Sequence, residues 1–358
     1  MLFEPIQIGG ITLPCRIAIP PMVITDSDES GTVTDREVAH YRRLGASGAA
    51  MVIQEATCVN DHSKLCATEI GIWDDRQIEG LRRISEAIHA GGAKAFMQLH
   101  HAGIKSVGDR REVPYDYDEV LWGTPIRGSA MTQETAERIR DEFIAAGRRA
   151  MLAGYDGVEL HAAHGYLLSQ ILNASLNRRT DTLGTDPCGY VRSILDGIRQ
   201  ATDGKLLVGI RIGGEEPTIA DGIDHVLRLR GSADYFHVSY GFSESPATRS
   251  AAVADFPYSA TVWMAMRVKQ ALRQVGDDTP VLAVGDLSKP GIAERVLAET
   301  GVDMVCVGRG HLVNDQWSND LRAGRAAGAC LLCRQCRWRE GICPGQRLLR
   351  KQRAGSGG

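Results

Sequence analysis

The chain has 358 residues, a formal net charge of −3, 43% hydrophobic residues and 40 glycines. This balance suits a globular protein with a large core, and it excludes the basic surface with which proteins bind nucleic acid or anionic membranes. The sequence shows neither an apolar run long enough to span a membrane nor a secretory signal pattern, so we expect a cytoplasmic protein.

Eight short apolar runs recur along the chain, and most of them precede an amphipathic, helix-like stretch. Such alternation is typical of buried parallel strands in βαβ units. The predicted strands are Arg16–Met22, Ala50–Gln54, Lys94–Leu99, Gly157–His161, Leu206–Arg211, Asp234–Ser239, Pro280–Gly285 and Asp303–Gly308.

Three of the intervening helices have clear sequence boundaries. Thr34 followed by Glu37 forms a capping-box pattern, and Thr132 is a suitable N-cap residue for a later helix. The predicted helices are Thr34–Leu44, Asp75–Ala90 and Thr132–Ala153.

Eight strands alternating with helices favour a closed barrel over an open doubly wound sheet. A doubly wound sheet usually carries G-x-G-x-x-G after its first strand, and no predicted strand is followed by that motif. We therefore predict an α/β fold, a (β/α)₈ TIM barrel over residues 1–328, with a short cysteine-rich C-terminal extension over residues 329–358.

Polar residues and glycines gather where these strands end, which is where barrel enzymes place their chemistry. Gly285, Gly308 and Arg309 follow the last two strands and suit a phosphate. Gln98 and Arg211 suit the N1–C2 edge of a flavin, where negative charge builds on reduction.

The fourth strand ends in a segment suited to a carbonyl substrate. His161 and His164 are placed to polarise its oxygen, and Tyr166 is placed to donate a proton. Two histidines also suit a metal, but no third ligand with suitable spacing lies nearby. Taken singly, each strand-end residue is equally explained by turn formation or a surface ion pair; their concentration at seven strand ends favours a site.

The string GYDGVELHAAHGYLLSQILNASLNRRTD, together with LFEPIQIGGITLPCRIAIPPM and VCVGRG, resembles the Old Yellow Enzyme family. The similarity is strongest to the FMN barrel of its 2,4-dienoyl-CoA reductase and trimethylamine dehydrogenase branch. It implies non-covalent FMN reduced by NAD(P)H, a small-molecule substrate, and a barrel that self-associates into a homo-oligomer.

The resemblance also implies roles for individual residues. Lys105 matches a basic residue of the substrate loop, and His161, His164 and Tyr166 match substrate-side residues. The implied flavin contacts are Pro21, Met22, Ala56, Gln98, Arg211, Gly285, Gly308 and Arg309.

Four of the nine cysteines crowd into the C-terminal extension, at Cys330, Cys333, Cys336 and Cys343. This spacing, with proline after the last cysteine, is typical of an iron–sulfur cluster held by four thiolates. The resemblance places a [4Fe-4S] cluster at this point of the long-chain relatives. A structural zinc site and a cysteine-rich tail without metal are the alternatives.

The predicted function is an FMN-dependent ene-reductase, or the reverse desaturase, acting beside a carbonyl group. An amine dehydrogenase or N-demethylase is the alternative within the enzymes. A non-catalytic flavin or iron–sulfur subunit of a larger complex is the alternative of another class. Since the long-chain relatives continue into a second nucleotide-binding half, a cluster here implies a separate electron-transfer protein.

Overall fold

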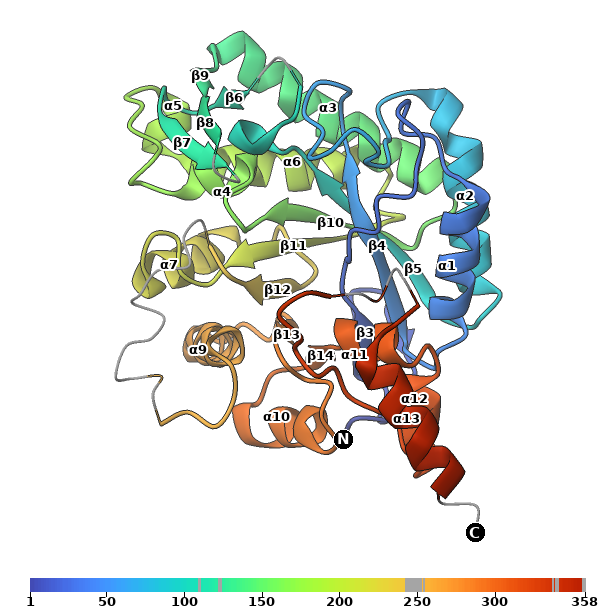
Figure 1. Ribbon diagram of the computed structural model, residues 1–358. Helices are drawn as coiled ribbons and strands as arrows, with labels where there is room; N and C mark the ends of the chain where they lie inside the picture. The colour runs from blue at the N-terminus through green and yellow to red at the C-terminus, as the bar shows by residue number, and fades with distance from the viewer. Residues whose placement is uncertain are drawn as a thin grey trace.

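The computed structural model describes residues 1–108, 111–121, 124–241, 253, 255–336, 338 and 341–355. Eight parallel strands close into a barrel, and each of them falls within or overlaps a predicted strand (Figure 1). In chain order they are β3 (Ile17–Ile19), β4 (Met51–Cys58), β5 (Lys94–His100), β10 (Gly157–Ala162), β11 (Leu207–Gly213), β12 (Phe236–Ser239), β13 (Val281–Val284) and β14 (Met304–Cys306). The predicted TIM barrel is confirmed.

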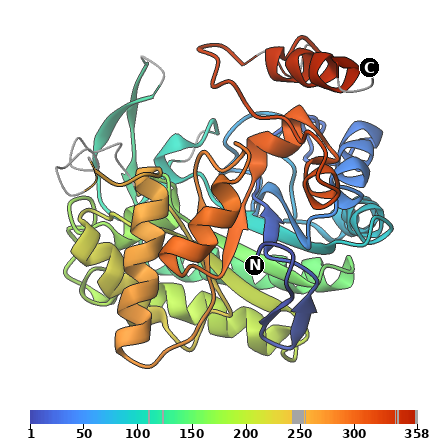
Figure 2. The same ribbon diagram turned by 90° about the horizontal axis from the view of Figure 1, so that it is seen from below.

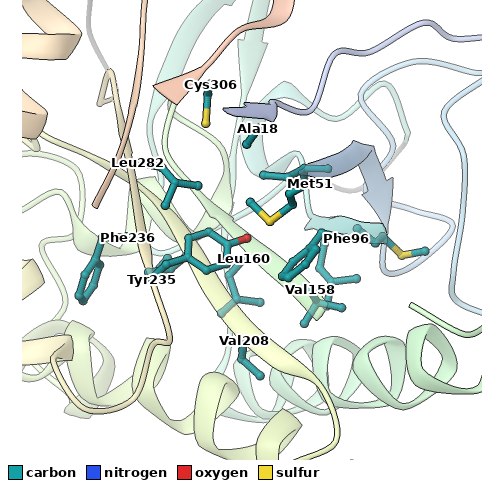
Figure 3. Close-up of a cluster of buried hydrophobic side chains, with 14 of the residues drawn as sticks. Ala18, Met51, Phe96, Val158, Leu160, Val208, Tyr235, Phe236, Leu282 and Cys306 are labelled. Atoms are coloured by element: carbon teal, nitrogen blue, oxygen red, sulfur yellow. The ribbon is translucent and has the colours of Figure 1, made fainter. Parts of the chain in front are cut away.

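The core fills both the inside of the barrel and the layer between strands and helices. Every residue of β10 is buried, as is expected where helices cover a parallel sheet. Figure 3 shows part of this core, in which Met51, Phe96 and Leu160 from three neighbouring strands point into one cluster.

Helices surround the barrel and alternate with its strands (Figure 1). They are α1 (Asp35–Gly45), α2 (Ile78–His89), α3 (Gln133–Leu152), α4 (Leu167–Leu172), α5 (Thr182–Thr185), α6 (Pro187–Ala201), α7 (Ile219–Leu229), α9 (Ala260–Gln274), α10 (Ile292–Thr300), α11 (Gly308–Val313) and α12 (Trp317–Arg322). Within the described residues, none of the helices is long and apolar enough to cross a membrane.

Two of the three predicted helix starts, at Thr34 and Thr132, are confirmed. Thr34 accepts a hydrogen bond from the Glu37 backbone N–H, and the Glu37 carboxylate accepts one from the Thr34 N–H at 2.8 Å. Thr132 caps α3 through the Thr135 N–H. The helix predicted over Asp75–Ala90 begins instead with a 3₁₀ turn (Asp75–Gln77), because Asp74 and Gln77 form their own capping box there.

Strand β4 runs four residues further than its predicted end at Gln54. A register shift between Gln54 and Thr57 marks a bulge, where the Gln54 amide donates to the Thr57 hydroxyl at 2.9 Å. Glu55 accepts the backbone N–H of Ile24 at 2.8 Å and the Tyr41 hydroxyl at 3.2 Å. These polar residues therefore lie in a buried strand because each has a partner.

Three short strand pairs lie outside the barrel sheet in the described part of the chain. Two are antiparallel hairpins: β1 (Ile6–Ile8) with β2 (Ile11–Leu13), and β7 (Asp118–Leu121) with β8 (Thr124–Arg127). β6 (Glu112–Val113) pairs in parallel with β9 (Ser129–Ala130) beyond the end of β5.

The C-terminal segment folds back onto the barrel after α12. The Trp317 indole donates to the Gly328 carbonyl at 3.2 Å, and the Gln346 amide donates to the Leu312 carbonyl at 3.2 Å. The last helix, α13 (Pro344–Gly355), buries Leu349 and lies at the edge of the molecule (Figure 2). The division into a barrel over 1–328 and a tail over 329–358 remains a prediction.

Candidate active site

Six of the eight predicted flavin contacts line one cavity of about 180 Å³ at the carboxyl ends of the barrel strands. The loop after β3, the end of β11 and the turns after β13 and β14 form it. These six residues are Pro21, Met22, Arg211, Gly285, Gly308 and Arg309. Ala56 and Gln98 are buried and are not part of the cavity lining.

Two glycines keep the backbone of this cavity open. Gly285 has φ of +125°, and a Cβ there would overlap the hydroxyl oxygens of Thr261 and Ser259. A Cβ on Gly308 would lie 2.8 Å from the Met22 sulfur. Gly285 therefore requires glycine, whereas at Gly308 a side chain would displace Met22, and both glycines allow a close approach of backbone to a phosphate.

A Gly285→Ala variant is expected to lose about 1–3 kcal/mol in its free energy of unfolding, because alanine is strained at this φ and has no room for its methyl group. The measurement is a urea titration with Gly10→Ala as the control, since a Cβ on Gly10 meets nothing within 4 Å. Equal unfolding midpoints for the two variants would show that Gly285 is not constrained.

Arg211 is the buried cation of the cavity. Its Nη2 donates to the Ser239 hydroxyl at 3.2 Å, while its Nε is buried with no partner among the described residues. Burial lowers the pKa of this guanidinium, and Glu159 opposes that shift. A buried donor without an acceptor is costly, so the residue fits an anionic or carbonyl edge of a ligand such as FMN.

Gln98 is buried next to Glu159 and outside the cavity lining. Its amide nitrogen donates to the Glu159 carboxylate at 2.8 Å, and the same carboxylate bonds His237 at 2.9 Å. This bond uses one of the two amide hydrogens of Gln98, so the second N–H and the side-chain oxygen remain for other partners.

Arg309 forms an ion pair with Asp286 at the mouth of the same cavity. Both side chains are about half exposed, so the pair is weak and Arg309 can exchange this partner for a phosphate. The sequence analysis did not assign a role to Asp286, which directly follows Gly285.

His161, His164 and Ser239 form a hydrogen-bonded chain that begins at Arg211. The His161 Nε2 to His164 Nδ1 distance is 2.9 Å, and the His164 Nε2 to Ser239 Oγ distance is 2.8 Å. Burial is the first cause that holds both imidazole pKa values well below their usual range, so the rings are neutral at neutral pH.

One direction of these bonds starts at Arg211. Arg211 only donates, so the Ser239 hydroxyl accepts from it, and in this direction the hydroxyl hydrogen goes to His164 Nε2. His164 Nδ1–H then donates to His161 Nε2, which leaves the hydrogen of His161 on Nδ1. That Nδ1 is buried and has no hydrogen-bond partner among the described residues.

Tyr166 lies directly against this chain. Its ring centroid is 4.7 Å from that of His161 and 4.4 Å from that of His100. Burial raises the pKa of Tyr166 to about 12, with Glu69 adding to the shift, so the phenol keeps its proton at neutral pH. Lys105 donates to the His164 carbonyl at 2.7 Å, which places the predicted substrate-loop lysine at the site.

The sequence analysis missed three residues of this site: Ser239, Glu69 and His100. Ser239 ends the predicted sixth strand, and His100 follows Gln98 by two positions, so strand-end position was the available signal. Glu69 lies in the irregular segment after β4 and had no such signal.

The four tail cysteines are not gathered into a metal site in this conformation. Cys333 and Cys336 are exposed, and no group of three or more His, Cys, Asp or Glu side chains able to hold a metal occurs in the described part of the chain. These thiols as arranged do not fit a four-thiolate cluster.

Residues 1–327 match the NADH:flavin oxidoreductase / NADH oxidase family. The chain belongs to this family. It is therefore an enzyme, a flavin oxidoreductase of the Old Yellow Enzyme type that uses FMN and NAD(P)H, and the expectation of a non-catalytic subunit is set aside.

Members of this NADH:flavin oxidoreductase family from bacteria align over most of the chain. The probable NADH-dependent flavin oxidoreductase YqiG of Bacillus subtilis (strain 168) is 33% identical over 341 residues, covering 90% of this chain and 88% of the relative. The NADPH dehydrogenase of Geobacillus sp. (strain WCH70) is 30% identical over 330 residues, covering 88% and 92%.

Solved structures support the same fold. A 2-naphthoyl-CoA reductase complex superposes with a TM-score of 0.81 at 23% identity, covering 90% of this chain and 52% of that chain. Morphinone reductase superposes with a TM-score of 0.72 at 23% identity, covering 91% and 90%. This flavin oxidoreductase thus spans about half the length of the first of these structures.

Proposed function

We propose that the enzyme reduces the activated C=C bond of an α,β-unsaturated carbonyl compound, or catalyses the reverse desaturation. The observation that carries this proposal is that the hydrogen-bonded, neutral imidazoles of His161 and His164 pack against Tyr166 at the end of β10. Reduction of such an alkene requires a donor to the carbonyl oxygen and a proton for the α-carbon, and the site offers one of each.

Bound FMN supplies the hydride for the β-carbon, and it would be held by Arg211, Gly285, Gly308 and Arg309. His161 Nδ1–H donates to the carbonyl oxygen, where negative charge develops as the hydride arrives. Ser239 and His164 hold the hydrogen of His161 on that nitrogen. Tyr166 delivers its phenolic proton to the α-carbon.

This arrangement favours an ene-reductase over an amine dehydrogenase. A site for a cationic amine tends to surround it with aromatic faces. Here the described neighbours of Tyr166 are imidazoles with neutral rings and the Lys105 ammonium, 5.3 Å from the Tyr166 ring centroid. The described ring contacts of Tyr166 are thus with imidazoles and with one lysine, and not with the phenyl or indole faces that an aromatic bowl for a cation would need.

The test is product analysis. The FMN-loaded enzyme with NADH or NADPH is expected to convert 2-cyclohexenone to cyclohexanone under anaerobic conditions. If the enzyme instead oxidises trimethylamine or histamine and does not reduce 2-cyclohexenone, the proposal is wrong and the protein is an amine dehydrogenase.

We also propose, from spacing and position alone, that Cys330, Cys333, Cys336 and Cys343 hold a metal once the tail rearranges around it. A [4Fe-4S] cluster is expected to give about four irons per chain, and zinc about one per chain. If the tail holds the cluster, we expect the enzyme to exchange electrons with a separate electron-transfer protein.

Replacing Cys333 by Ser is expected to remove most of the bound metal while FMN content stays unchanged, because the tail lies outside the flavin cavity. Metal assays on anaerobically purified protein measure this, with Cys188→Ser as the control, since Cys188 is a buried cysteine of α6. Wild-type protein without iron or zinc would rule out both metal sites.

A further inference from the structure

The segment between β3 and α1 forms one wall of the flavin cavity without regular secondary structure. Its residues Pro20, Pro21 and Met22 line the cavity, and Met22 lies close against Gly308 on the facing wall. Thr25, three residues further, has a φ of +52°. This left-handed conformation is strained for a β-branched residue, so other groups must hold the segment in it.

The buried side chain of Glu55 holds this segment in place. Glu55 belongs to the bulged part of β4, and its Oε2 accepts the Ile24 backbone N–H at 2.8 Å and the Thr25 backbone N–H at 3.3 Å. The Thr68 hydroxyl donates to the Thr25 carbonyl at 3.1 Å. Side chains that follow the start of β4 therefore fix Thr25 at both its N–H and its carbonyl group.

The direction of the two Glu55 bonds does not depend on the protonation state of its carboxyl group. Backbone N–H groups only donate, so Oε2 accepts from both. Burial raises the pKa of Glu55 to about 8, although the Ile24 N–H opposes this shift. A proton on the neutral carboxyl group lies on Oε1, which is 3.2 Å from the Tyr41 hydroxyl. The neutral and the charged carboxyl group thus both hold the segment.

We propose that Glu55 is a positioning residue for FMN, which holds Thr25 in its left-handed conformation and thereby keeps the Pro21–Met22 wall of the cavity in place. This role rests on the assignment of the cavity to FMN and extends it, because Glu55 is not part of the cavity lining and acts through the backbone of the segment. Without Glu55, Thr25 turns to a negative φ and Met22 moves relative to Gly308.

The affinity for FMN in two variants of one residue tests this role without turnover. Glu55→Leu removes the acceptor of both N–H groups, whereas Glu55→Gln keeps an oxygen for them. Glu55→Leu is expected to bind FMN roughly tenfold more weakly, and Glu55→Gln is expected to stay within about threefold of the wild type. The dissociation constants are measured by quenching of flavin fluorescence as FMN is titrated into flavin-free protein.

Two comparisons separate positioning from a merely structural role. Glu37→Leu also removes a fully buried acid, one that accepts the Thr34 N–H, and it is expected to lower stability but to keep FMN affinity within about twofold. Adding Thr25→Gly to Glu55→Leu is expected to recover part of the affinity, because glycine adopts a positive φ without strain. Glycine adds no contact, so a loss caused by general destabilisation would not be recovered.

Thr25→Pro changes the same segment without a substitution in the buried strand. Proline fixes φ at about −65° and has no N–H, so the left-handed conformation is impossible. This variant is expected to bind FMN roughly tenfold more weakly, and it tests the role of the segment even if Glu55→Leu does not fold.

The proposal is overturned by wild-type FMN affinity in Glu55→Leu or Thr25→Pro, by equal losses in Glu55→Leu and Glu55→Gln, or by no recovery with Thr25→Gly. An equal loss in Glu37→Leu overturns it as well. Arg211→Met tests the cavity separately: wild-type affinity in that variant would mean that FMN binds elsewhere. A loss in Arg211→Met without one in Glu55→Leu would remove only the role of Glu55, and neither result depends on the reduction of an enone.

Discussion

A Tyr166→Phe variant is expected to reduce an enone about 10²- to 10⁴-fold more slowly than the wild type, while NAD(P)H reduces its FMN at an unchanged rate. The phenol is the group placed to protonate the α-carbon, and phenylalanine keeps the ring packing on His100 and His161. Hydride transfer into the flavin needs no proton from this side chain. The two half-reactions are measured separately by anaerobic stopped-flow absorbance.

Tyr190→Phe is the matched control, because the Tyr190 hydroxyl donates to the Ala136 carbonyl at 2.8 Å, away from the active site. It is expected to leave both half-reactions unchanged. Full enone reduction by Tyr166→Phe would remove the phenol from the reaction, and equal slowing of both half-reactions would indicate damage to the flavin site instead.

An Arg211→Met variant is expected to bind FMN about 10- to 150-fold more weakly, because a charge-assisted hydrogen bond contributes roughly 1.5–3 kcal/mol. Methionine fills a similar volume and leaves the buried Ser239 hydroxyl without its arginine donor. The dissociation constant is measured by quenching of flavin fluorescence on titration of FMN into flavin-free protein.

Arg192→Met provides the control, since the Arg192 guanidinium donates to the Arg228 carbonyl on the exterior of the barrel. Arg211→Lys keeps a cation without the guanidinium fork and is expected to recover only part of the affinity. If Arg211→Met retained wild-type affinity for FMN, the assignment of the cavity to flavin would be wrong.

The barrel was predictable from sequence because continuous apolar runs alternate with capped helices. Arg16–Met22 and Asp303–Gly308 were predicted as strands from their apolar residues alone, and each contains one three-residue strand of the closed barrel, β3 and β14. The end of β4 was not predictable, since Gln54, Glu55 and Thr57 are polar and are accommodated only through partners such as Ile24 and Tyr41.

The site was predictable where one strand end carries its chemistry. His161, His164 and Tyr166 are close in sequence, Arg211 lies near the end of β11, and Gly285 and Gly308 follow the neighbouring strands β13 and β14. Spatial pairings between distant residues were not predictable: His100 meets Glu69, 31 positions away, and His164 meets Ser239, 75 positions away. Such pairings depend on the closed barrel and on the path of the segment after β4.

The cysteine tail is the opposite case, because its sequence pattern has no matching metal site among the described residues. The four cysteines are close together in the sequence, but Cys333 and Cys336 are exposed and do not converge on a metal site. Metal binding orders such ligands as it occurs, so spacing and a metal-free arrangement can differ.

The most direct test of the central claim is an anaerobic absorbance experiment on FMN-loaded protein. NADH or NADPH is added to bleach the flavin band, and 2-cyclohexenone is then added in excess. We expect the band to bleach and then to return as cyclohexanone forms in equal amount. A protein that does not retain FMN, or whose bleached flavin is not reoxidised by the enone, would contradict the account.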